Sequence, residues 1–119
     1  MVLKSLDAKY DYDARVDVVT IEVKKEYEYE ISLDLEVGVF LHFDKNYFPV
    51  GLEIIDASKK IGVDKNFLTS PSGSVEISIK EEAINVNLTF EHDNENGSMS
   101  LNSINESFIP DIEADFALV

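Results

Sequence analysis

The chain has 119 residues, 45% of them hydrophobic, and a formal net charge of −14 from 24 acidic and 10 basic side chains. It contains no cysteine, which excludes disulfides, thiolate metal ligands and a cysteine nucleophile. A surface of this sign repels phosphate backbones, so we expect no nucleic-acid partner. The length suffices for one hydrophobic core and falls short of two, which predicts a single domain over residues 1–119.

The composition also predicts where the protein works. No segment has the length and apolar content of a signal peptide or a transmembrane helix, so we expect a soluble cytoplasmic protein with no membrane partner. The sequence lacks a phosphate-binding glycine loop, a nucleophile elbow and two histidines at ligand spacing, so we expect no cofactor. Whether a small molecule binds stays open.

The first predicted element is a β-hairpin over residues 8–23. Residues 8–12 form its short first strand, and a turn follows in which Asp13 and Asp17 can accept hydrogen bonds from nearby backbone amides. Residues 16–23 are rich in β-branched side chains, which favours a second strand.

A long alternating pattern follows between Tyr27 and Phe43. Every odd position is apolar or aromatic, whereas the even positions up to Glu36 are glutamate, serine or aspartate. This period of two predicts a strand with one buried face. The run exceeds the roughly 3 to 10 residues of an ordinary strand, so we expect a break or bulge near Glu36 to Gly38.

A second hairpin follows, with a four-residue loop over Lys45 to Phe48. This loop predicts three apolar cross-strand pairs on one face: Phe43 with Val50, Leu41 with Leu52, and Val39 with Ile54. The strand leads into a short helix over residues 56–62, capped by the Asp56 side chain and ended by Gly62. A second helical turn is expected within residues 64–69.

The remaining segment, residues 74–119, is predicted to be a β-rich extension of the preceding hairpins and helix, residues 8–69. Alternation predicts strands over residues 75–79, 84–90 and 99–101, with an Asn-Gly turn in the loop 93–97. Residues 108–119 fit a helix with Pro110 near its start and also fit a strand, and we favour the helix. The expected fold class is therefore α+β: a mainly antiparallel sheet of hairpins, one short helix after the central hairpin and a second helix at the C-terminus.

Two of these segments carry a recognisable pattern. Tyr12-Asp13 is followed after three residues by Asp17 and an apolar strand, and the second hairpin ends in Gly-x-Glu-Ile-x-Asp-Ala-Ser over residues 51–58. Over residues 8–65 the chain resembles the family called domain of unknown function 2283, or DUF2283. The resemblance implies a small antiparallel sheet with one helix and no established chemistry. Some family members sit beside small toxin-like proteins, which implies a neutralising partner.

The chain departs from the family pattern at two positions. Tyr47 stands where members usually have a glycine in the hairpin turn, so we expect the positive φ angle at Asn46 instead. His42 stands where an aspartate is common in the strand.

Two groups of residues are candidate sites. His42, Glu53 and Asp56 could bind a divalent metal or act as an acid and base pair. They could instead be a polar strand residue, a solvent-facing glutamate and a helix cap. Tyr27, Glu28 and Tyr29 could recognise a basic peptide through aromatic faces and carboxylates, or be half-buried tyrosines beside solvated glutamates.

The leading functional hypothesis is a non-enzymatic protein-binding module. Open antiparallel sheets leave edges that a partner can cover, and the acidic surface suits a basic partner. The module would form a homodimer or neutralise a basic, toxin-like protein. The alternative is a divalent-metal-dependent or acid/base enzyme that uses His42, Glu53 and Asp56.

Overall fold

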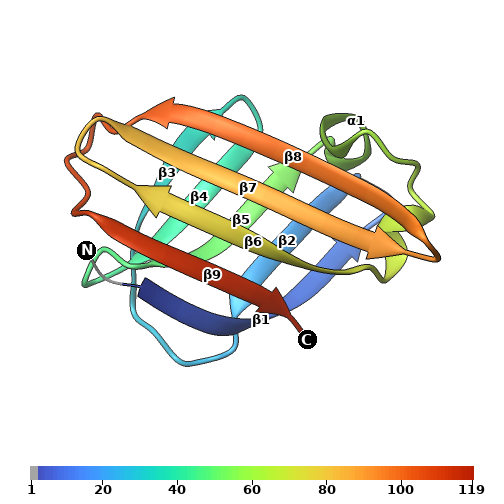
Figure 1. Cartoon of the computed structure of the whole chain (residues 1–119), viewed down its shortest axis with the longest axis horizontal. Coiled ribbons are helices and arrows are strands. Elements are labelled where there is room, and N and C mark those ends of the chain that lie inside the picture. The colour runs from blue at the N-terminus through green and yellow to red at the C-terminus, as the bar shows by residue number, and fades with distance from the viewer. Residues whose placement is uncertain (1–2) are drawn as a thin grey trace.

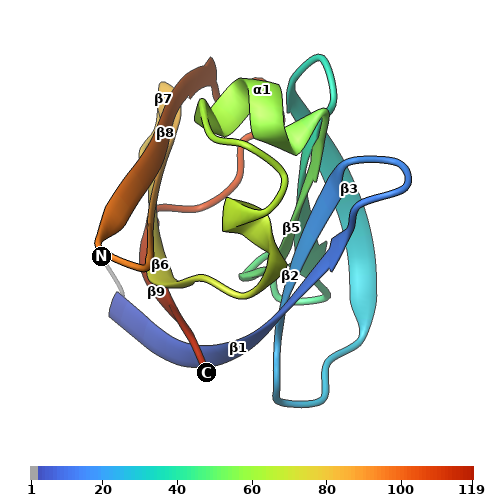
Figure 2. The same ribbon diagram turned by 90° about the vertical axis from the view of Figure 1, so that its right-hand side faces the viewer.

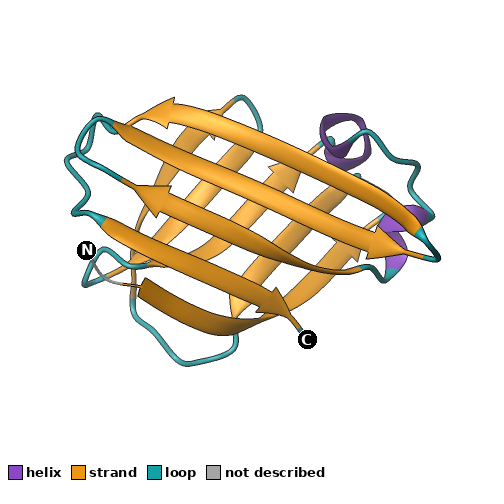
Figure 3. Cartoon of the chain, in the orientation of Figure 1, coloured by secondary structure: helices purple, strands orange, loops and turns teal. Residues whose placement is uncertain are grey.

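The computed structural model describes residues 3–119 of the chain (Figure 1). Strands dominate these residues, and the helical parts are short (Figure 3). The elements in order are β1 (Leu3–Asp13), β2 (Val18–Val23), β3 (Tyr29–Glu36), β4 (Val39–Asp44), β5 (Pro49–Ile55), α1 (Ala57–Ile61), the 3-10 helix η1 (Phe67–Thr69), β6 (Ser72–Ile79), β7 (Ala83–His92), β8 (Glu95–Ile104) and β9 (Ile112–Leu118).

All nine strands belong to one sheet with the order β3-β4-β5-β2-β1-β9-β6-β7-β8. Neighbouring strands are antiparallel, except that β1 and β9 run parallel. A mainly antiparallel sheet with one short helix after the second hairpin was predicted, and the structure confirms it. The predicted second helix at the C-terminus is wrong.

β1 joins the two halves of the sheet. Its first part, Leu3 to Ala8, pairs with β9, and its second part, Ala8 to Asp13, pairs with β2. Figure 2 shows the sheet curving at β1, so that β2 to β5 face β6 to β9 across the interior. The edge strands β3 and β8 therefore approach each other although they are the two ends of the strand order.

The space between the two halves is filled by one hydrophobic core. Its largest fully buried side chains include Phe43 from the first half and Phe90 and Phe116 from the second. The buried apolar residues of both halves form a single contiguous cluster. Burial of apolar surface between the halves is thus what holds the curved sheet closed.

The predicted break in the long alternating run is confirmed. β3 ends at Glu36 and β4 begins at Val39, with Gly38 at a φ of 79° between them. Two of the predicted cross-strand pairs are also confirmed, Leu41 with Leu52 and Val39 with Ile54.

The third predicted pair, Phe43 with Val50, is wrong. The register shifts after His42, so that Phe43 lies opposite Pro49. The Asp44 carboxylate accepts hydrogen bonds from the backbone N–H groups of Asn46 and Phe48, at 2.8 and 3.0 Å. These bonds tighten the loop and displace the pairing by one residue on one strand.

The positive φ angle of this loop falls on Tyr47, at 61°, and not on Asn46 as predicted. The Tyr47 N–H donates to the Asp44 carbonyl at 2.9 Å, which closes a turn from Asp44 to Tyr47. Tyr47 follows this turn in the left-handed conformation, at the position where family members usually have glycine.

The C-terminal segment is strand β9, because its side chains alternate between buried and partly exposed positions. Ile112, Ala114 and Phe116 are buried, as a period of two requires and a helix would not allow. β9 pairs with β1 on one side and β6 on the other, so it fills the gap between the halves.

The turn between β7 and β8 is also not where the Asn-Gly signal predicts it. Asp93 and Asn94 occupy the two turn positions, with φ angles of 48° and 66°, and Gly97 lies inside β8. A Cβ atom at Gly97 would lie 2.8 Å from a Val63 methyl group and 3.1 Å from one of Ile61. This glycine therefore serves the close packing of β8 against the end of α1.

Candidate functional site

The DUF2283-like signature residues form one hydrogen-bond network at the start of α1. The Asp17 carboxylate is buried and accepts hydrogen bonds from the Tyr12 hydroxyl at 2.7 Å, the Ser58 hydroxyl at 2.7 Å and the Ser58 backbone N–H at 3.1 Å. The Asp17 carbonyl also accepts from the Ala57 N–H at 2.9 Å. The network fastens the helix to the first hairpin, which is a structural role.

Asp17 is therefore the residue that caps α1, and the prediction of an Asp56 side-chain cap is wrong. Asp56 occupies the N-cap position with a φ of 57°, but its side chain makes no capping hydrogen bond. The carboxylate that reaches the first turn comes from the β1–β2 connection, far away in sequence. Gly62 ends the helix in the left-handed conformation, as predicted.

The network shifts the pKa values of its two acidic groups. Burial would raise the pKa of the Asp17 carboxyl, but the hydrogen bonds from Ser58 and Tyr12 outweigh burial and hold this pKa below its ordinary value. Burial and the hydrogen bond to Asp17 raise the pKa of Tyr12 to about 12. Both shifts follow from the arrangement in which Tyr12 donates to an ionised Asp17.

The lowered pKa of Asp17 makes the stability of the chain depend on pH. An ionised Asp17 stabilises the fold above about pH 4, the ordinary aspartate value, and this contribution is lost as the pH falls through the lowered pKa. We expect the difference in unfolding free energy between the wild type and Asp17→Asn to shrink between pH 6 and pH 2. Urea unfolding across this range measures it, and a constant difference would contradict the assignment.

His42 lies in a chain of polar groups on the outer face of the sheet. The Ser32 hydroxyl is 2.5 Å from His42 Nδ1 and 2.7 Å from the Tyr29 hydroxyl, and the Glu53 carboxylate is 4.0 Å from His42 Nε2. The structure thus brings His42 and Glu53 together. Asp56 lies apart at the helix start, and within residues 3–119 no group of three histidine or acidic side chains could hold a metal ion.

The predicted peptide-binding group of Tyr27, Glu28 and Tyr29 lies along two open grooves: Tyr27 and Glu28 line one, and Tyr27 and Tyr29 line the other. Glu28 forms an ion pair with Lys45 at 2.6 Å, and Tyr27 packs partly against the core. The groove of Tyr27 and Tyr29 is also lined by three lysines, Lys9, Lys24 and Lys25, and by two glutamates, Glu22 and Glu26. Its lining thus carries charges of both signs, and recognition of a basic peptide there stays a prediction.

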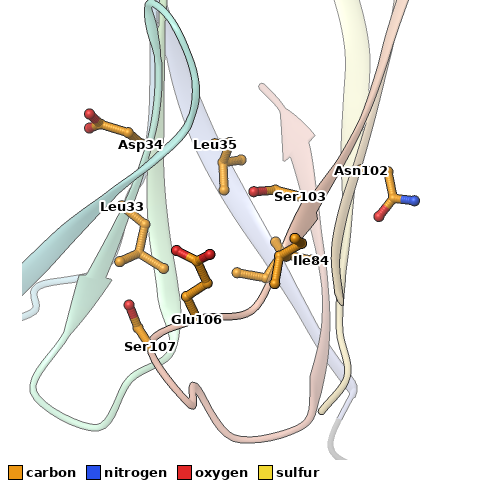
Figure 4. A pocket seen from close by; sticks show the side chains of 9 residues that line it. Leu33, Asp34, Leu35, Ile84, Asn102, Ser103, Glu106 and Ser107 are labelled. Carbon is orange, nitrogen blue, oxygen red and sulfur yellow. The ribbon is translucent and has the colours of Figure 1, made fainter. Parts of the chain in front are cut away.

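A second groove lies at the open seam, by which we mean the gap between the edge strands β3 and β8. Its volume is about 480 Å³, and its lining comes from β3, the start of β7 and residues 102–107. In Figure 4 the side chains of Leu33 and Leu35 line one wall, and the Glu106 carboxylate points between Leu33 and Ile84. The groove thus sets the apolar side chains of Leu33, Leu35, Ile84 and Ile104 among five polar lining residues, two of which, Asp34 and Glu106, are acidic.

Exposed apolar side chains lie beside this groove. Ile104 at the end of β8 is 71% exposed, and Phe108 in the following loop is 87% exposed. The loop is held in place by buried Asn105, whose side-chain amide donates to the carbonyls of Lys80 and Ile109, each at 2.9 Å, and accepts from the Ile109 N–H at 3.1 Å. Phe108 is therefore presented to solvent by an anchored loop.

The two strands at the seam differ in how their edges are protected. β3 is irregular, with register shifts at two points, and it carries exposed Glu30, Asp34 and Glu36. β8 pairs with β7 without interruption from Glu95 to Ile104 and has no charged residue or proline after Glu95. Charges and bulges are the devices that keep sheet edges from pairing, so β8 is the less protected edge.

The structure thus defines a class: a curved, mainly antiparallel sheet with one capped helix, closed around a core and open at one seam. Residues 9–58 match the family model "Protein of unknown function (DUF2283)", which confirms the resemblance seen in the sequence. The match covers β2 to β5 and the second part of β1, from residue 9 onward, and it ends at Ser58, in the first turn of α1. No significant match was found among curated proteins or solved structures. Within the described residues no helix is long and apolar enough to cross a membrane.

Proposed function

We propose that the chain is a non-enzymatic protein-binding module that takes a basic partner at the open seam. The observation that carries this proposal is the exposed, anchored Phe108 beside Ile104 and the Glu106 carboxylate. Aromatic side chains that stand in solvent on a fixed backbone are frequent anchors of protein interfaces. A basic partner suits the carboxylates of this region better than a second acidic chain does.

The charge of the C-terminal part supports a basic partner. From Asn66 to Val119 the chain has ten acidic residues and one basic residue, Lys80, which pairs with Glu113 at 3.8 Å. No described side chain forms an ion pair with Glu106. The partner's lysine or arginine side chains would therefore find carboxylates that are not already neutralised.

A double variant tests the proposal. In affinity capture from native cells, we expect the double variant Ile104→Ser/Phe108→Asn to capture at least about tenfold less partner than the wild type does. The reason is that truncating a buried aromatic anchor costs about 2 kcal/mol or more. Asparagine tolerates the positive φ of 56° at Phe108, so stability should change little. Val37→Asn is the matched control, since Val37 is 93% exposed in the turn after β3 and does not line the seam groove.

Two results would contradict this proposal. One is equal capture of the same basic protein by the wild type and the double variant. The other is a strict monomer by light scattering together with no protein retained by the wild type.

A further inference from the structure

We propose that the free edge of β8 pairs with an extended segment of the partner, which adds to the sheet as a tenth strand beside the seam groove. This inference rests on the proposed function and specifies how the partner binds. Among the described elements β8 stands at one end of the strand order and is hydrogen-bonded to β7 alone; β3 approaches it across the seam without pairing, so the seam must widen to admit an added strand. Its outer edge therefore presents backbone donors and acceptors that an added strand can use.

The C-terminal half of β8 is the part that suits such pairing. At the other end, Gly97 packs under Ile61, Val63 and Phe67, so α1 and the following loop cover the strand there. From Met99 onward the side chains that face the interior become less covered, because Leu101 and Ser103 are only partly buried. An added strand would lie over these positions.

The groove gives the added strand a place for alternate side chains. Successive residues of a strand point to opposite faces, so every second side chain would face the groove walls of Leu33, Leu35 and Ile84. The remaining side chains would face solvent beside Asn102, which points away from the groove in Figure 4. Backbone pairing supplies affinity in this mode, and the groove supplies selectivity for apolar side chains.

Charge favours a basic segment of a partner over a second copy of this chain as the added strand. Full antiparallel pairing of two β8 strands would bring the Glu95 end of each against the Glu106 end of the other, so like charges would meet at both ends. A second copy would also double a net charge of −14. An extended segment with lysine or arginine beside apolar residues avoids both penalties and can pair with Glu106 and Asp34.

The test uses the full chain and three synthetic peptides of ten residues. The first alternates valine and lysine, the second is identical but carries N-methyl groups at alternate backbone positions, and the third alternates valine and glutamate. We expect only the first to bind well, with NMR shifts and slowed amide exchange confined to residues 98–107 and β3. The N-methyl peptide should bind at least about tenfold more weakly, because it keeps the charge but loses strand pairing.

Two protein variants test whether the effect of a removed charge depends on its position at the seam. Glu106→Gln should lower the affinity for the valine-lysine peptide about threefold, as expected for the loss of an exposed charge pair. Glu76→Gln, on the outer face of β6, should leave this affinity unchanged. Equal binding of the methylated and unmethylated peptides would overturn strand addition but leave binding of a basic partner standing. If light scattering instead showed a dimer whose contacts map to β8, the second copy would be the occupant and this inference would be wrong.

Discussion

Asp17→Ala is expected to lower the free energy of unfolding by about 3 kcal/mol at pH 7, because a hydrogen bond to a charged acceptor contributes about 1.5–3 kcal/mol net and the three bonds to this one carboxylate do not add independently. The substitution removes the acceptor of three hydrogen bonds and leaves the Ser58 N–H at the helix start without its partner. The hairpin and α1 would then be fastened only by backbone contacts and apolar packing. Urea unfolding followed by circular dichroism measures the change.

Asp56→Ala is the matched control for this variant. Both aspartates have a φ of 57°, so both substitutions place alanine in the left-handed region at similar cost. Only Asp17 has side-chain hydrogen bonds to the helix, so we expect Asp56→Ala to cost about 1 kcal/mol or less. A larger loss for Asp56→Ala than for Asp17→Ala would show that the cap has been assigned to the wrong residue.

Gly73→Ala is expected to be the most damaging glycine substitution in the chain. A Cβ atom at this position would lie 2.1 Å from the Thr89 carbonyl oxygen and 3.1 Å from the Phe90 Cα atom. Both neighbours are backbone atoms of β7, so relief requires β6 and β7 to separate where Gly73 pairs with Phe90. We expect a loss of about 3 kcal/mol or more in unfolding free energy, above the usual cost of overpacking.

Gly62→Ala provides the comparison. No atom lies within 4 Å of a Cβ at Gly62, so its cost comes only from a φ of 79°, about 1 kcal/mol. Thermal unfolding of both variants distinguishes the two causes. If Gly73→Ala unfolded at the same temperature as Gly62→Ala, β6 and β7 would have to be less closely paired at Gly73 than described.

Much of the fold could be predicted because alternation is a local property. The run from Tyr27 to Phe43 predicted both β3 and β4, and Gly38 marked the break between them. The register at Leu41 and Val39 followed from placing apolar residues on one face. Each of these features depends on neighbours within one hairpin.

Features set by distant parts of the chain could not be predicted in the same way. Residues 108–119 fit both a helix and a strand, and the gap between β1 and β6 decided in favour of β9. Gly97 follows Asn96, a pair that predicts a turn, and only the fold reveals its close contacts with Val63 and Ile61. The cap of α1 is supplied by Asp17, which lies 41 residues before Ser58 in sequence.

The candidate site also has a part that could be predicted from the sequence and a part that could not. The sequence predicted a sheet edge as a binding surface and placed His42 near Glu53, which the structure brings to 4.0 Å. It did not predict the open seam, because β3 and β8 meet only when the sheet curves at β1. The uncharged stretch from Asn96 to Ile104 and the isolated Phe108 were the signals available in the sequence.

Hydrogen–deuterium exchange of the chain alone and in complex with its captured partner tests the central claim most directly. We predict that partner binding slows exchange in residues 98–104 of β8 and in the adjacent loop, while the outer face around His42 and Glu53 stays unchanged. Slowed exchange around His42 and Glu53, with β8 unaffected, would contradict binding at the open seam.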